Sequence, residues 1–312
     1  MNDIKIPIIA VVGPTASGKT SLAVDLARHI GAEIVSCDSM QIYKELNVAS
    51  AKPTSDEMQG IPHHMIDIVS CKSRFSVADY VALASEKIQE IYRRNKPIIL
   101  CGGTGLYVDS LLNCIDFSND TADDELRNSL KDQYLEHGGE YMYDLLCKVD
   151  NAAAEKIHPN NVKRVLRALE IYYSSGRSKT EQDEIARNNE SIYRTLYIGI
   201  NYKDRNALYD RINRRVDIML TDGLLDEVKG FYSIDGVNTA SQAIGCKELK
   251  PYLDGEKTLN ECVDHLKMQT RRYAKRQLTW FGRNNEINWL YPDVDNDYVN
   301  KAIALCEDFF RR

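Results

Sequence analysis

The feature that most constrains this chain is a glycine-rich turn near its start, between an apolar run and a helical pattern. Residues 7–12 form a run of strand length, and positions 13–20 read Gly-Pro-Thr-Ala-Ser-Gly-Lys-Thr. This turn matches the P-loop pattern G-x-x-x-x-G-K-[ST], and the apolar residues of 21–30 recur with helical spacing. The sequence therefore predicts an α/β fold with a phosphate site on Gly13, Pro14, Thr15, Ala16, Ser17, Gly18, Lys19 and Thr20.

The residue types in the turn explain how it would bind phosphate. Gly13 and Gly18 let the backbone fold back so that successive N–H groups face an anion, and the following helix points its positive end at it. Lys19 adds a mobile positive charge, and the hydroxyl of Thr20 can ligate Mg²⁺. The alternative is that the turn matches the P-loop pattern by chance. The expected strand before it and the expected helix after it both count against that alternative.

Composition narrows the class of protein. The chain has 312 residues, of which 43% are hydrophobic, and its net charge is −6. It has no apolar run long enough to span a membrane and no secretory signal at its start, which predicts a cytoplasmic protein. Eight cysteines without a C-x-x-C pair argue against a zinc cluster. The net negative charge alone counts against nucleic acid as a partner, but a local basic face can still bind phosphates.

Two further apolar runs end in polar residues that are candidates for chemistry. Asp38 follows the strand expected at 32–36, and Thr104 follows the strand expected at 97–101. Ligands of open α/β folds bind at the carboxyl ends of strands, so Asp38 is a candidate Mg²⁺ ligand or general base and Thr104 a candidate substrate contact. The alternatives are a turn or helix cap at Asp38 and a tight loop at Thr104. Ordinary P-loop ATPases carry an Asp where this chain has Cys101.

Adjacent histidines, His63 and His64, invite a metal-site interpretation. Neighbouring side chains of an extended segment point to opposite faces, so a structural or substrate-edge role is favoured.

The pattern changes between residues 115 and 190, where the chain is polar, rich in charge and helical in its spacing. Residues 160–170 alternate basic side chains with an apolar face. That alternation fits a solvated amphipathic helix and a phosphate-binding helix equally well.

Two helices after this segment carry clustered arginines and lysines. Arg211 and Arg215 are four apart in a helix expected at 204–220, so they share a face. They can clamp a diphosphate if that face turns to the P-loop, and they only solubilise the chain if it turns to water. A longer helix expected at about 256–282 interleaves bases with aromatic residues, a composition typical of nucleic-acid contact. The basic and aromatic residues concerned, in this helix and just after it, are Lys267, Arg271, Arg272, Tyr273, Lys275, Arg276, Trp280 and Arg283.

Six motifs, in order and over nearly the whole chain, resemble the tRNA dimethylallyltransferase family, also called tRNA isopentenyltransferases. They occupy positions 13–20, 38–43, 51–54, 102–107, 242–245 and 273–281. The resemblance implies transfer of a dimethylallyl group from dimethylallyl diphosphate to N6 of the adenine at tRNA position 37, just 3′ of the anticodon. The tRNAs concerned read codons that begin with U.

The resemblance also implies an architecture, a cofactor and partners. A P-loop kinase-like parallel-sheet core over 1–114 and 191–312 would be split by a helical insertion over 115–190 that grips the anticodon stem-loop. Mg²⁺ would be the cofactor, tRNA and dimethylallyl diphosphate the partners, and the chain would be a monomer.

Roles for single residues follow from the same resemblance. Asp38 would be the general base, Thr104 would help to hold the flipped adenine, and Arg211 and Arg215 would stabilise the departing diphosphate, which the P-loop cradles with Mg²⁺ on Thr20. Contacts to tRNA are expected from Asp38, Ser39, Met40, Gln41, Thr104, Arg127, Lys163, Arg164, Val165, Leu166, Arg167, Gln242, Ile244, Gly245, Arg271, Lys275 and Arg276.

Three other functions stay open at the level of sequence. An isopentenyltransferase that acts on free adenine nucleotides would share the P-loop and the Asp, but it would not need the insertion or the basic helix. A P-loop kinase lacks support because Cys101 replaces the expected acidic residue. A noncatalytic RNA-binding protein would keep its RNA affinity when Asp38 is replaced and would have no turnover to lose.

Overall fold

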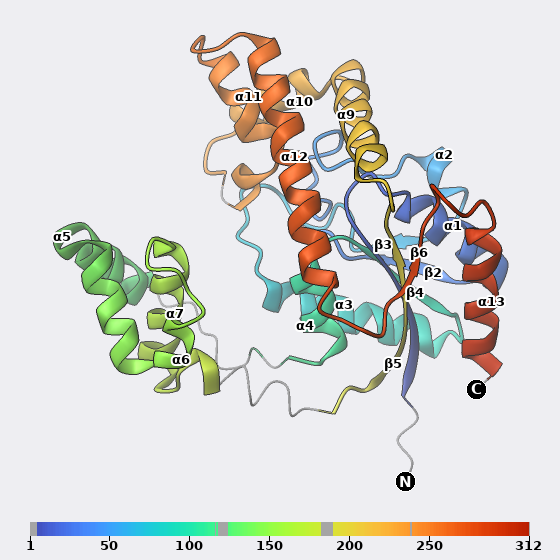
Figure 1. Cartoon of the computed structure of the whole chain (residues 1–312), viewed down its shortest axis with the longest axis horizontal. Coiled ribbons are helices and arrows are strands. Elements are labelled where there is room, and N and C mark those ends of the chain that lie inside the picture. Colours follow the sequence, from blue (N-terminus) through green and yellow to red (C-terminus); the bar gives the residue numbers. More distant parts are fainter. Residues whose placement is uncertain (1–4, 116, 118–123, 182–189, 238, 312) are drawn as a thin grey trace. The chain divides into compact units, whose positions relative to one another are not determined.

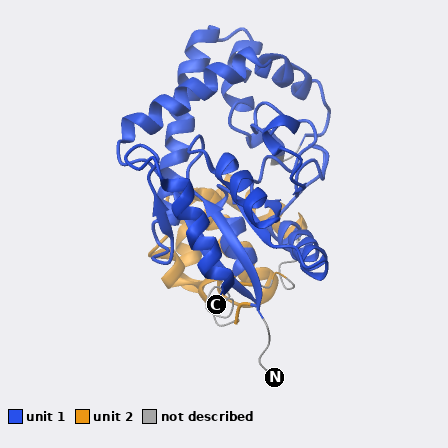
Figure 2. Cartoon of the chain, turned by 90° about the vertical axis from the view of Figure 1, so that its right-hand side faces the viewer, with its two compact units in different colours: residues 1–112, 192–312 blue, residues 113–191 orange. Residues whose placement is uncertain are grey.

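A computed structural model of the chain describes residues 5–115, 117, 124–181, 190–237 and 239–311. The chain divides into two compact units, one formed by residues 1–112 and 192–312 and the other by residues 113–191 (Figure 2). The second unit covers the segment predicted to be an insertion, and it interrupts the first unit in sequence.

The first unit is built on a six-stranded sheet in which every pair of neighbouring strands is parallel. The order is β3-β2-β4-β1-β5-β6. Short apolar runs form the central strands because both faces of a parallel sheet are covered. The strands are β1 (Ile6–Val12), β2 (Glu33–Ser36), β3 (His63–His64), β4 (Ile98–Gly102), β5 (Tyr193–Ile200) and β6 (Asn288–Leu290).

Helices of the first unit occupy the segments between and after these strands (Figure 1). They are α1 (Lys19–Ile30), α2 (Ser55–Met58), α3 (Val77–Arg93), α4 (Gly105–Leu112), α9 (Arg205–Thr221), α10 (Leu224–Tyr232), α11 (Cys246–Leu253), α12 (Leu259–Phe281) and α13 (Tyr298–Arg311), with a 3₁₀ turn at Thr239–Gln242. These elements give the α/β fold that the sequence predicts.

Side-chain caps set two of the helix starts. The Ser76 hydroxyl accepts a hydrogen bond from the backbone N–H of Asp79, and α3 begins at Val77. The long helix was expected from about residue 256, but α12 begins at Leu259. The difference arises because Thr258 forms a capping box with Glu261 and fixes the first turn there.

Two layers of helices cover the sheet. Ile9 and Val11 of β1 pack in one buried cluster with residues of α1 and α13. Contacts to β2 and β4 come from α3, and α4 also packs on β4. The long helix α12 contacts α4 near one end and runs along α9 and α11, where α10 also packs (Figure 1). Helix α4 thus contacts both the sheet and α12.

The second unit is helical over its described residues. Its helices are α5 (Asp124–Val149), α6 (Asn151–Ala154) and α7 (Val162–Ser175), and they enclose their own core of Leu130, Met142, Leu146, Val165 and Leu169. The segment α5 is two helices joined at a kink, because Gly138 has a φ of 82°. Over the described residues of the whole chain, no helix combines the length and the apolar character needed to cross a membrane.

Candidate functional site

The sheet order brings the ends of three strands to one edge. Because β2, β4 and β1 are parallel neighbours, the turns that follow them lie side by side. Backbone hydrogen bonds tie two of these turns together: Cys37 N–H donates to the Cys101 carbonyl at 2.8 Å, and Thr104 N–H donates to the Cys37 carbonyl at 3.2 Å. The P-loop, Asp38 and Thr104 therefore belong to one site.

The P-loop has the backbone that phosphate binding requires. Gly13 has a φ of 143° and Gly18 a φ of 99°, both in the region that favours glycine. A Cβ on Gly13 would also lie 2.4 Å from the carbonyl oxygen of Ile200. Since Gly18 precedes the first residue of α1, the unpaired N–H groups at the start of this 12-residue helix face the loop.

Lys19 folds back over this loop. Its Nζ donates a hydrogen bond to the Pro14 carbonyl oxygen at 2.6 Å. Burial lowers the pKa of Lys19 to about 8; the positive charge of Arg215 acts in the same direction, while Cys101 and the carboxylate of Asp38 oppose it. Lys19, Asp38 and Arg215 are thus close enough to act on one another's charge.

Asp38 uses one carboxylate oxygen to hold its own turn. Oδ1 accepts hydrogen bonds from the N–H groups of Met40 at 2.8 Å and Gln41 at 3.4 Å. The turn role left open by the sequence is therefore present. Oδ2 accepts no hydrogen bond within the described part of the chain and remains available to take a proton.

Thr104 stands at the start of α4 and faces the turn of Asp38. Its Oγ1 accepts a hydrogen bond from the Ser39 N–H at 3.1 Å, and its carbonyl accepts from the N–H groups of Tyr107 and Val108. The neighbouring Gly102 has no room for a side chain, because a Cβ would lie 2.2 Å from the Cys37 carbonyl oxygen. Close packing of two backbones thus sets the distance between Asp38 and Thr104.

Helix α9 turns its two arginines to this edge of the sheet. Arg211 donates from Nε to the Ala16 carbonyl oxygen at 2.9 Å, and its guanidinium lies over the ring of Tyr202. Arg215 is half-buried; desolvation lowers its pKa, while the negative charges of Asp38 and Glu57 oppose that shift. Both guanidinium groups belong to the positive rim of the P-loop.

The side chains around the P-loop fit a divalent cation that is held mainly by the oxygens of a bound phosphate group. Over the described residues, no cluster of three or more His, Cys, Asp or Glu side chains is arranged to hold a metal. Burial raises the pKa of Cys101 to about 11, so the residue at the usual Asp position is a neutral thiol. Thr20, half-buried in the first turn of α1, offers a hydroxyl oxygen. One protein oxygen with water and phosphate oxygens suits Mg²⁺.

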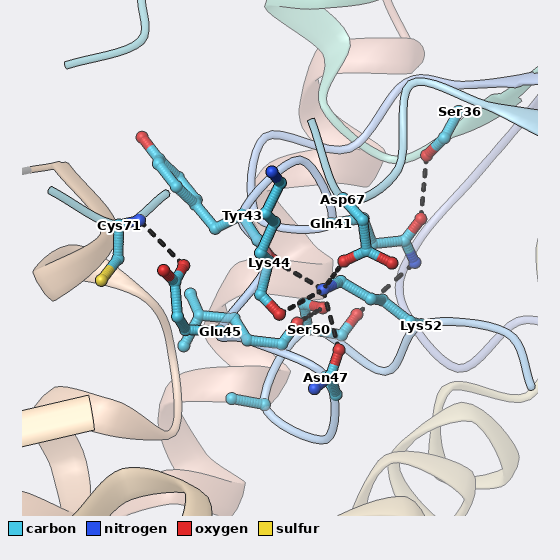
Figure 3. A network of polar contacts seen from close by, with 12 residues as sticks. Ser36, Gln41, Tyr43, Lys44, Glu45, Asn47, Ser50, Lys52, Asp67 and Cys71 are labelled. Carbon is cyan, nitrogen blue, oxygen red and sulfur yellow. Dashed lines mark hydrogen bonds and ion pairs between the residues drawn. The ribbon is translucent and has the colours of Figure 1, made fainter. Parts of the chain in front are cut away.

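Gln41 braces a loop with its side chain. Its Oε1 accepts from the Ser36 hydroxyl at 2.8 Å, and its Nε2 donates to the Ala51 carbonyl at 3.3 Å (Figure 3). In the same network, Lys52 donates to the Tyr43 carbonyl at 2.6 Å and pairs with Asp67. A direct contact of the Gln41 amide with tRNA would break these bonds, whereas Ser39 and Met40 are half-buried on the neighbouring turn.

The basic residues of α12 do not share one face. Lys267 pairs with Asp217 at 2.5 Å, and Arg271 donates to the Asn213 side chain at 2.6 Å, so both face α9. Arg272, Lys275 and Arg276 are exposed. The predicted basic residues of this helix therefore fall into two groups. Lys267 and Arg271 join α12 to α9, whereas Arg272, Lys275 and Arg276 face solvent.

In the second unit, several residues predicted to contact tRNA either pair with an acidic side chain or lie in the core. Arg127 and Arg167 both pair with the buried Glu170, at 2.6 and 3.0 Å. Val165 is 1% exposed within the core, so its side chain cannot reach a ligand in this structure, and Leu166 packs against the same core. The helix is amphipathic, with Lys163 and Arg164 exposed.

Residues 242–245 lead into α11. Gln242 is exposed and Ile244 is half-buried. Gly245 has a φ of 109°, and its N–H donates to the Glu248 carboxylate at 2.9 Å. Glycine is required at this helix start for its backbone conformation.

Sequence reasoning gave no site role to Gln277 or Glu227. Gln277 accepts a hydrogen bond from the P-loop N–H of Thr15, and the Glu227 carboxylate accepts from the N–H groups of residues 47, 48 and 49, all at 2.8 Å. Gln277 lies within one of the six motifs, which is the signal that could have pointed to it. The histidines have structural partners: His64 bonds to Glu33 and His63 to the Ile61 carbonyl.

Comparison with known proteins gives a consistent result. The model of the IPP transferase family matches residues 41–285. A tRNA dimethylallyltransferase of Bacillus licheniformis is 48% identical over 306 residues, which is 97% of each chain. One from Thermoanaerobacter sp. is 46% identical over 300 residues, covering 95% of this chain and 94% of the relative.

Solved structures agree. The tRNA isopentenylpyrophosphate transferase of Bacillus halodurans is similar with a TM-score of 0.72 and 42% identity, covering 98% of this chain and 99% of that one. A eukaryotic dimethylallyltransferase acting on tRNA has a TM-score of 0.84 and 30% identity, covering 98% of this chain and 80% of that one. With the P-loop edge described above, these similarities lead to one conclusion: the chain belongs to the IPP transferase family.

Proposed function

We propose that this chain transfers the dimethylallyl group of dimethylallyl diphosphate to N6 of the adenine at tRNA position 37, in tRNAs reading codons that begin with U. Relatives that it matches over nearly their whole length are named tRNA dimethylallyltransferases. The observation that carries the proposal is the joining of a phosphate cradle, an Asp38 carboxylate with a free oxygen and Thr104 at one sheet edge.

The donor would bind with its diphosphate in the P-loop. The N–H groups at the start of α1 and the ammonium of Lys19 would contact the phosphate oxygens. As the bond between the allylic carbon and the diphosphate oxygen breaks, negative charge grows on the leaving group. Arg211 and Arg215 at the loop's rim would stabilise that charge.

The acceptor would bind at the turn of Asp38 and Thr104. The N6 lone pair of a flipped adenine attacks the allylic carbon as the diphosphate leaves, and Oδ2 of Asp38 takes the proton that N6 then loses. Oδ1 stays bonded to the turn, so the carboxylate keeps its orientation during proton transfer. The Thr104 hydroxyl is placed to hold the base beside it.

Mg²⁺ is proposed as the cofactor, held by the Thr20 hydroxyl and the diphosphate. When bound, it would neutralise charge on the diphosphate and make it a better leaving group.

Recognition of tRNA is assigned to exposed basic residues. Lys163 and Arg164 of the helical unit and Lys275 and Arg276 of α12 are exposed and would contact phosphates of an anticodon stem-loop. The proposal includes a monomeric, cytoplasmic protein, since a tRNA-modifying enzyme works where tRNA is.

An acceptor experiment tests the proposal. The purified protein, with Mg²⁺ and labelled dimethylallyl diphosphate, is given an unmodified anticodon stem-loop, the same stem-loop with G in place of A37, or AMP. Label on the first stem-loop alone supports the proposal. Label on AMP alone would assign the chain to the free-nucleotide enzymes, and label on no acceptor would leave a kinase or a binding protein.

A further inference from the structure

One buried side chain of α12 joins two of the glycine turns at the site. Gln277 is 5% exposed, its Oε1 accepts a hydrogen bond from the Thr15 N–H at 2.8 Å, and its Nε2 donates to the Gly103 carbonyl at 2.9 Å. Thr15 lies in the turn after β1 and Gly103 in the turn after β4. The helix that carries Gln277 is far from both in sequence, so a single carboxamide bridges two turns that follow the paired strands β1 and β4.

The chemistry of this bridge is specific to a carboxamide. Thr15 offers an N–H and needs an acceptor, whereas Gly103 offers a carbonyl and needs a donor. A carboxylate would satisfy the first and repel the second. Gly103 also has to lack a side chain, because a Cβ there would lie 2.1 Å from Nε2 of Gln277. Its φ is outside the left-handed region, so this close approach is what restricts the position to glycine.

Side chains one turn away on α12 hold the same segment. Residues 273, 277 and 280 share a face of the helix. The phenol of Tyr273 lies near the side chains of Thr104 and Gln277, and Nε1 of Trp280 donates to Asp109 of α4 at 2.8 Å. This face of α12 therefore lies along the turn after β4 and the start of α4. Gln277, in the middle of the face, also contacts the P-loop.

We propose that Gln277 is a positioning residue that sets the distance between the diphosphate cradle and the turn that carries Thr104, so that donor and acceptor meet in line. The inference rests on the proposed function. A displacement of about 1 Å between reacting groups can cost roughly 100-fold in rate while binding of each substrate persists. Because each turn keeps its own ligand contacts, loss of the bridge should lower kcat and leave the binding of each ligand nearly unchanged.

A double-mutant cycle tests the proposal. Gln277→Ala removes the bridge, and Gly103→Ala displaces the Gln277 side chain, so each is expected to lower kcat at least tenfold. Kd for inorganic pyrophosphate and KM for the stem-loop should change less than threefold. In the double variant the Cβ at 103 has no clash with residue 277, and its nearest remaining neighbour is the Gly13 carbonyl oxygen at 3.4 Å. Its kcat should therefore equal that of Gln277→Ala, whereas independent residues would give multiplied losses.

Two further variants complete the design. Gln277→Glu keeps the acceptor for Thr15 and loses the donor to Gly103, so its kcat should fall as far as that of Gln277→Ala even if Gly103→Ala does not fold. Gln269→Ala removes a glutamine of the same helix whose Nε2 bonds only to His265 within the described residues, and it should keep wild-type kcat.

Several outcomes would overturn the positioning role: wild-type kcat in Gln277→Glu, multiplied losses in the double variant, or a loss of pyrophosphate affinity as large as the loss of kcat. A merely structural role would lower Tm without the split between kcat and binding. A wild-type protein that labels no stem-loop would instead contradict the proposed function.

Discussion

Arg211 of α9 donates from Nε to the carbonyl oxygen of Ala16 at 2.9 Å, so a helix from the second half of the chain is attached directly to the P-loop. Ala16 also packs against the small cluster of Leu208, Ile212 and Ala274, which joins α9 to α12. Apolar packing thereby sets the position of the arginine, and the hydrogen bond sets its orientation toward the phosphate site.

Replacing Arg211 with Ala should lower kcat by about 100-fold, the loss typical of removing one group that stabilises transition-state charge. Single-turnover transfer to the stem-loop measures it. The control is Arg214→Ala, an exposed arginine of the same helix, which should keep its rate. Equal rates for the two variants would mean that Arg211 serves the loop's structure alone.

Asp38→Asn separates the two roles of this carboxylate. The asparagine Oδ1 can still accept from the Met40 N–H, so the turn is kept, but Nδ2 cannot take a proton. We expect turnover to fall by about 100-fold to 10,000-fold, as for other general bases. RNA affinity, followed by fluorescence anisotropy, should stay within a few-fold. Asp226→Asn, on the exposed face of α10, is the matched control. Near-normal turnover would remove Asp38 as the base.

The pKa of Lys19, lowered to about 8, predicts a pH dependence of donor binding. Below pH 8 the ammonium is charged and attracts diphosphate; above pH 8 the free protein loses this charge, so affinity should fall by up to about tenfold per pH unit. Calorimetric titration with pyrophosphate between pH 6.5 and 9.5 would measure it. Lys19→Met isolates the contribution of Lys19, because any titration of pyrophosphate itself persists in that variant. Parallel pH curves for both proteins would contradict the prediction.

Glu227→Gln should destabilise the protein by about 2 kcal/mol, since one carboxylate oxygen accepts from the N–H groups of Asn47 and Val48 and an amide nitrogen cannot. Urea denaturation measures the free energy of unfolding. Glu256→Gln, at an exposed position of the same unit, is expected to change it by less than about 0.5 kcal/mol. A similar value for both variants would show that the three N–H groups find other partners.

The carboxylate of Glu33 is expected to account for part of the loss of folding stability at low pH. Burial alone would raise its pKa, but hydrogen bonds from Arg94 and His64 outweigh it and hold the pKa below 4.5. A lowered carboxyl pKa contributes stability that is complete above the unfolded value and is lost as pH falls through the folded value. Glu33→Gln should therefore lose stability at pH 7 and show a flatter decline below about pH 5. Thermal melts across that pH range would measure the change of stability with pH. The same slope in Glu33→Gln and in the wild type would contradict the prediction.

Much of the fold could be predicted because local patterns determine it. The apolar runs at 7–12, 32–36 and 97–101 predict the strands β1, β2 and β4. The residues that follow strands, Asp38 and Thr104, could be placed at one edge because parallel strands end together. Each of these inferences needed only a segment and its immediate neighbours.

Contacts between distant segments could not be predicted in the same way. Helical spacing shows that Arg271 and Lys275 are one turn apart, but not that Arg271 bonds to Asn213 of another helix. The Gln41 side chain was assigned to tRNA, yet Ser36 and Ala51 engage it. Local patterns do not reveal the role of Gln277 either, because its partners, Thr15 and Gly103, belong to other elements of the chain.

The pairing of β1 with β5 has a consequence for biosynthesis. Ile6 pairs with Tyr193, so the first strand to leave the ribosome waits for one neighbour until the entire helical unit has been translated. At roughly 5–20 residues per second, this delay lasts on the order of ten seconds or more. During that time one side of β1 has no strand partner, and the core residues of the interrupting unit are all translated before β5. The nascent chain therefore has to complete the inserted unit before the sheet that carries the candidate site can close.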